Sequence, residues 1–131
     1  MVDLTDSVQI AVYTALTAGV TLAPVYSVVP EGTQPPYVVI GDDTVDPTLG
    51  AKDGVFEQHD IRIVTVFGGA SKRALSAAMQ QVRQALADRP MTATGANLSP
   101  PIVLSSGDRV DAQSGVFVGE QTFRIFAQPG D

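Results

Sequence analysis

Apolar positions follow two different periods along this chain, and the period marks where helices and strands are expected. Apolar residues at helical spacing predict a first helix over residues 5–18. A cleaner stripe of the same kind, from Leu75 to Leu86, predicts a second helix that ends before Pro90. Each of these helices has one apolar side and one polar side, so each needs a single surface to pack against.

The remaining periodic segments alternate or are continuously apolar, which is typical of strands. Pro36 opens one of them, as expected for a residue that cannot donate a ladder hydrogen bond inside a sheet. Turn residues between positions 46 and 54 indicate a hairpin loop rather than a boundary between domains. The predicted strands cover residues 26–29, 37–45, 55–67, 102–110 and 116–127.

This order of elements predicts an α+β fold in a single domain over residues 1–131. We expect a mixed, mostly antiparallel sheet of four to five strands, with the two amphipathic helices packed on one face. The other face is left for solvent or for another subunit. The connection between residues 67 and 102 leaves room for the last strand between the two strands that it joins.

The composition excludes more classes of function than any single motif does. The 131 residues include no cysteine, which excludes disulfides, thiolate metal sites and cysteine nucleophiles. The net charge of −6 comes with only eight scattered basic residues, which argues against binding to nucleic acid through its phosphates. No apolar run approaches the length of a membrane span, and the acidic N-terminal residues do not resemble a secretory signal.

Carboxylates gather around the predicted hairpin, and they are the first candidate for chemistry. The chain lacks the spacing of a calcium loop, and we interpret the cluster as a solvated acidic loop. Adjacent residues of a strand face opposite ways, so Asp42 is expected on the face of Val38 and Ile40, with Asp43 on the other. The cluster consists of Asp42, Asp43, Asp46, Asp53 and Glu57.

Two further features resemble parts of enzyme sites, but the other residues that such sites need are missing. His59 is the only histidine, and it is expected on the face of Ile61 as a structural or surface residue. The FGGASK segment, residues 67–72, does not have the spacing of a phosphate-binding loop and is interpreted as a tight turn. The residues therefore predict no enzyme, no catalytic or metal-binding residue and no cofactor.

Several longer segments resemble the tail completion, or tail terminator, proteins of long-tailed (siphovirus-like) bacteriophages and gene transfer agents. The most characteristic piece is PEGTQPPYVVIG, residues 30–41. It follows the helical segment VYTALTAG and precedes the strand IRIVTVFGGAS, the helix ALSAAMQQVRQALAD and the closing FRIFA. The similarity covers nearly the whole chain.

The resemblance implies a structural virion protein of the neck or tail top, present in the host cytoplasm during assembly. Proteins of this family are expected to form a homo-hexameric ring that caps the head-proximal end of the tail tube and stops its polymerisation. The expected partners are the major tail tube protein and the head connector or stopper protein. DNA is expected to pass through the lumen without specific binding, and no membrane or cofactor is involved.

The ring implied by the resemblance needs two different contact surfaces on each subunit. Candidate residues for the subunit interface lie on the exposed sheet face and strand edges: Pro36, Tyr37, Val39, Val116 and Val118. Candidate residues for a hairpin at the lumen or the ring axis are Asp46, Thr48, Lys52 and Asp53.

Three alternatives remain open at this point. The chain could be another neck protein of the same particle, such as a head-completion or connector subunit. It could be a small acidic domain with a metal site or an enzymatic activity, or a general binding module with no viral role.

Overall fold

The computed structural model describes residues 4–46, 57–68, 72–110 and 115–130. Two helices and six strands alternate along these residues, which confirms the predicted α+β class with one strand more than the upper expectation. The elements in chain order are α1 Thr5–Gly19, β1 Val25–Tyr26, β2 Tyr37–Asp46, β3 Glu57–Phe67, α2 Lys72–Leu86, β4 Ala96–Leu98, β5 Ile102–Val110 and β6 Phe117–Pro129.

The six strands form one mixed sheet. Its strand order is β1-β2-β3-β6-β4, and β5 also pairs with β6. Only β1 and β2 run parallel to each other, and the other pairs are antiparallel. Strand β6 lies between β3 and β5, as the sequence predicted for the last strand. The additional strand is β4, which lies outside all of the strand ranges predicted from the sequence.

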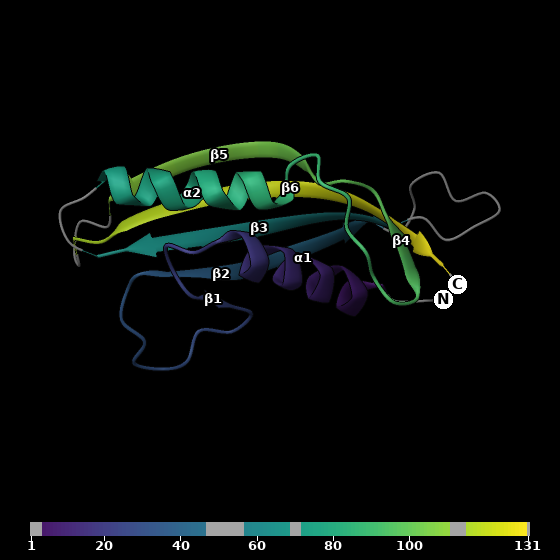
Figure 1. The fold of residues 1–131 in the computed structure, drawn as a ribbon, viewed down its shortest axis with the longest axis horizontal. Coiled ribbons are helices and arrows are strands. Elements are labelled where there is room, and N and C mark those ends of the chain that lie inside the picture. Colours follow the sequence, from purple (N-terminus) through teal and green to yellow (C-terminus); the bar gives the residue numbers. More distant parts are fainter. Residues whose placement is uncertain (1–3, 47–56, 69–71, 111–114, 131) are drawn as a thin grey trace.

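Both helices cover the same face of the sheet (Figure 1). Helix α1 lies over β1 and β2, and α2 lies over β3 and β6. The helices contact each other closely at Gly19, where an added Cβ would come within 2.7 Å of the Ala85 Cβ. A side chain at this position would push the helices apart, which explains a glycine at the end of α1.

The core lies between the helices and the inner face of the sheet, which is the face that the helices cover. Its largest fully buried side chains come from both layers: Phe123, Leu16, Ile61, Ile63, Leu75, Leu86 and Ile125. Alternate residues of β3 and β6 point into this core and leave the intervening residues on the opposite, outer face. The outer face is therefore free of helices, as expected from the two single-sided helices.

None of the helices among the described residues is both long enough and apolar enough to cross a membrane.

Candidate functional site

The outer face of the sheet is divided into an apolar end and a charged centre. At the apolar end, Tyr37 pairs with Val66, and Val66 pairs with Val118, across β2, β3 and β6. The next row on the same face begins with Val39 and Val64. With Tyr26, whose ring lies edge-on to Tyr37 at 6.4 Å between centroids, these residues form what we name the outer apolar patch: Tyr26, Tyr37, Val39, Val64, Val66 and Val118.

The structure thus brings together residues that the sequence placed in two separate segments. Tyr37 and Val39 from β2 and Val118 from β6, all candidate interface residues, share the outer apolar patch. Pro36 is exposed immediately before β2, and Val116 is half-buried immediately before β6. Of the candidate hairpin residues, Asp46 is the last residue of β2, while Thr48, Lys52 and Asp53 lie outside the described residues.

The charged centre of the outer face is a network of ion pairs between neighbouring strands. Arg62 lies 2.9 Å from Asp42 and 4.0 Å from Glu120, and Arg109 lies 2.8 Å from Glu120. The hydrogen bond from Arg109 holds the pKa of Glu120 below its usual range. These side chains are between one-third and four-fifths exposed, so they form a neutral, solvated surface rather than a binding pocket.

A separate pair on the same face continues the network toward the far end of the strands. Arg124 donates two hydrogen bonds to the Asp60 carboxylate, at 2.9 and 3.1 Å. The same contact raises the pKa of Arg124, mainly through the hydrogen bond to Asp60. The three basic and three acidic side chains of these ion pairs are thus matched within one subunit.

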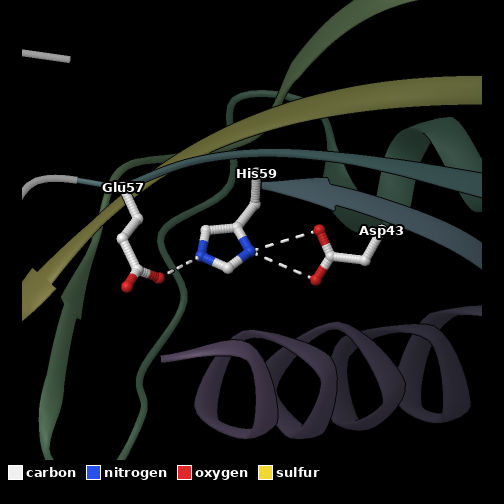
Figure 2. Close-up of polar contacts among 3 residues, drawn as sticks. All are labelled: Asp43, Glu57 and His59. Atoms are coloured by element: carbon white, nitrogen blue, oxygen red, sulfur yellow. Dashed lines mark hydrogen bonds and ion pairs between the residues drawn. The ribbon is translucent and has the colours of Figure 1, made fainter. Parts of the chain in front are cut away.

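The inner face carries a cluster that the sequence did not predict as a unit (Figure 2). The His59 imidazole lies between two carboxylates: Nδ1 is 3.1 and 3.2 Å from the oxygens of Asp43, and Nε2 is 2.8 Å from Glu57 Oε1. The His59 side chain is fully buried, and those of Asp43 and Glu57 are each 4% exposed. We name these three residues the buried histidine cluster.

Two ionised carboxylates accept hydrogen bonds and cannot donate them, so the geometry favours an imidazolium that donates from both nitrogens. Burial works to lower the pKa of His59, but the hydrogen bonds and charges of Asp43 and Glu57 outweigh it and raise that pKa above its usual value. Neither ring nitrogen is left to exchange a proton with a substrate. The cluster therefore joins β2 to β3 and has no free group for catalysis.

Asp42 and Asp43 lie on opposite faces of the strand as predicted, but the face predicted for each of them was wrong, and a β-bulge is the reason. The register of β2 against β3 shifts between Ile40 and Asp43, so that Gly41 and Asp42 both lie opposite Arg62. The extra residue moves Asp43 to the inner face and leaves Asp42 on the outer face, the reverse of strict alternation. An added Cβ at Gly41 would lie 3.1 Å from the Arg62 carbonyl oxygen, so this position has little room for a side chain.

Part of the buried histidine cluster could have been found from the sequence. His59 shares the face of Ile61 as predicted, and Glu57 shares it by the same alternation. Asp43 could not be assigned, because nothing in the sequence locates the bulge. Within the described ranges, no set of three or more His, Cys, Asp or Glu side chains is placed to hold a metal ion.

Two comparisons with known proteins found similar proteins. The sequence profile described as "Tail completion protein gp17" matches residues 9–128. A solved structure entitled "Virion of native gene transfer agent (GTA) particle" contains a chain that superposes with a TM-score of 0.86 at 25% identity, over 99% of this chain and 100% of that one. No curated protein sequence matches. Because the profile covers most of the sequence, this chain belongs to the tail completion protein gp17 family.

Proposed function

We propose that this protein is a ring-forming tail terminator: it caps the head-proximal end of a tail tube, stops tube polymerisation and joins the tail to the head. The observation that carries the proposal is the family match over residues 9–128, supported by the similar fold in a gene transfer agent virion. The protein is a structural component of the virion, and its ring is proposed to be a hexamer.

The proposed partners are other copies of the chain, the major tail tube protein and the head connector or stopper protein. The outer apolar patch supplies part of the contact area between subunits of the particle. It joins four strands, and five of its six side chains are partly exposed. Apolar surface of this kind on a sheet face marks a site of protein contact. The ion pairs beside it match three basic side chains with three acidic ones within the subunit.

The acidic character of the chain supports a passive lumen for DNA. A net charge of −6 per subunit gives a strongly acidic ring, which repels phosphates and lets DNA slide without adhering. Asp46, at the end of β2, is the described residue closest to the hairpin that we propose for the lumen or the ring axis. A bore lined by lysine and arginine would contradict this part of the proposal.

The test combines two measurements on the purified protein. Mass photometry is expected to show rings, and negative-stain imaging is expected to show them at one end of tubes assembled from the tail tube protein of the same particle. Tubes grown in the presence of the protein should also stop at a shorter length. Protein that neither forms rings nor binds tube ends would overturn the proposal, and rings that bind only the head connector would make the protein another neck component.

A further inference from the structure

Two stretches of the sheet margin have no neighbouring strand among the described residues. Strand β1 covers β2 only at Val38 and Val39, so β2 has no neighbouring described strand on that side from residue 40 to residue 45. Strand β5 pairs with β6 on one side only, over residues 102–110. Figure 1 shows β2 and β5 along opposite long margins of the sheet. Unpaired strand edges offer backbone N–H and C=O groups to another strand.

We propose that copies of this chain join edge to edge: residues 40–45 of β2 in one copy pair with β5 of the next, so that one sheet continues around the ring. This inference rests on the proposed ring and names the surfaces that close it. A ring needs two different surfaces that fit each other, and the sheet has two different free edges.

Strand direction supports this pairing. Because β2, β3, β6 and β5 are antiparallel in succession, β2 and β5 run in opposite directions within one subunit. A rotation about a ring axis roughly along the strands preserves those directions. The β5 strand of one copy therefore meets the β2 strand of its neighbour antiparallel, and the alternation continues without interruption.

The two margins carry different charged groups. On the open stretch of β2, Asp42 is 78% exposed and pairs with Arg62 of the same subunit, while Asp43 points inward to His59. The β5 margin is flanked by α2, which has three basic residues and no acidic one: Lys72, Arg73 and Arg83. Arg73 and Arg83 make no ion pair within the described ranges of the chain. Opposite charge on the two surfaces favours contact between unlike margins over contact between like ones.

The helix layer stops short of β5 and leaves a groove there. Helix α2 packs on β3 and β6, and a groove of about 500 Å³ lies between α2 and β5. Its lining includes Arg83 and Gln121, and the Gln121 side chain is 2% exposed with its Oε1 unpaired. The Gln121 Nε2 donates to the Met79 carbonyl, which leaves Oε1 without a donor among the described residues. A neighbour seated along β5 would cover this groove.

Both margins carry a β-bulge, which limits how they pair. The bulges lie between Ile40 and Asp43 in β2 and between Val103 and Ser105 in β5. Bulges protect edges against indiscriminate pairing, and here they leave regular stretches at residues 43–45 and 105–110. We therefore expect pairing in one register, over these short stretches.

Engineered cysteines test the pairing directly, because the chain has none of its own. Thr44→Cys is combined in one chain with Ser105→Cys, Gly107→Cys or Arg109→Cys, which sample three registers on the same face of β5. Mild oxidation of the assembled ring is expected to give a covalent ladder up to the ring size in one of the three, reversed by reductant. The control pair is Thr14→Cys, exposed on α1, with Gly107→Cys, and it is expected to give no ladder.

The outcomes separate this inference from the proposed function. Reduced variants should assemble like the parent in mass photometry, which shows that they fold. A ladder in one register with a silent control supports edge-to-edge pairing. Rings without a ladder in any register, or with an equal ladder in the control, overturn the pairing and leave the terminator proposal standing. A parent chain that stays monomeric overturns both.

Discussion

Two polar networks lie on opposite faces of the same strands, and they differ in their surroundings rather than in their chemistry. On the inner face, His59 is held between Asp43 and Glu57 with no exposure to solvent. On the outer face, Arg62 and Arg109 meet Asp42 and Glu120 at similar distances, and the side chains remain in water. Adjacent aspartates, Asp42 and Asp43, belong to different networks because the bulge separates them.

This difference predicts very different energies. A buried ion pair is costly to break, because removing one partner leaves a charge without solvent or counter-ion. An exposed pair contributes little, because water replaces the lost contact. The inner cluster therefore fixes the fold where β2 joins β3, while the outer network keeps its charges in water and balanced.

The largest expected effect comes from removing the imidazole. His59→Leu leaves two buried carboxylates facing each other and should lower the free energy of unfolding by about 3–5 kcal/mol. Urea denaturation followed by circular dichroism measures it. Arg62→Met, which removes an exposed partner from the outer network, is the matched control and should cost less than about 1 kcal/mol.

A triple variant sharpens that result. Replacing His59, Asp43 and Glu57 together with leucine removes the charges as well as their partner, so it should be more stable than His59→Leu. If the single variant were no less stable than the Arg62→Met control, the contrast between the two faces would be lost.

The pH dependence of stability should also come from the inner face. Because the folded state raises the pKa of His59, the cluster is fully stabilising below about pH 6.5, the usual value for an unfolded histidine. This stabilisation decreases as the pH rises through the folded pKa. Denaturation between pH 6 and pH 9 should show the loss, and an NMR titration of the imidazole should locate the folded pKa. If the stability of the His59→Leu variant depended on pH in the same way, the effect would come from a group other than His59.

The bulge predicts an unusual tolerance to deletion. Gly41 and Asp42 together face Arg62, so deleting Asp42 restores regular pairing and keeps Asp43 opposite Ile61. The variant loses one exposed ion pair and should lose about 1 kcal/mol or less. Deleting Val64 from the unbulged β3 is the control and should prevent folding, because it moves the neighbouring buried residues to the wrong face. Thermal denaturation compares the two, and equal losses would contradict the assignment of the bulge.

The sequence predicted the elements with a strong period and missed those that depend on distant partners. The stripe from Leu75 to Leu86 indicated α2, and alternation placed His59 on the face of Ile61. Strand β4 has three residues and exists because β6 extends far enough to pair with it, which no local pattern reveals. The same limit hid the buried histidine cluster, since the bulge that brings Asp43 to His59 is a property of the β2–β3 register.

The candidate interface residues show the same contrast between what a local pattern predicts and what depends on distant parts of the chain. Alternation placed Tyr37 and Val39 on one face of β2, and Val118 was assigned to a different segment. Their common patch follows from the order β2-β3-β6, which the sequence did not predict. The sequence showed that each of these residues is apolar. That they lie close together could be seen only from the strand order of the sheet.

The smallest expected effect on stability lies on the outer face. There, a substitution should change a pKa while leaving the free energy of unfolding nearly unchanged. Arg109 is 61% exposed and Glu120 36% exposed, so Arg109→Met should lower the free energy of unfolding by less than about 1 kcal/mol, and by less still in high salt. The pKa of Glu120, which Arg109 now holds below its usual range, should rise in the variant. An NMR titration of the Glu120 carboxyl measures this change beside the denaturation curve. If the Glu120 pKa did not change, the contact between Arg109 and Glu120 would not be part of the network. A large loss of stability would show that the outer face stabilises the fold as much as the inner face does.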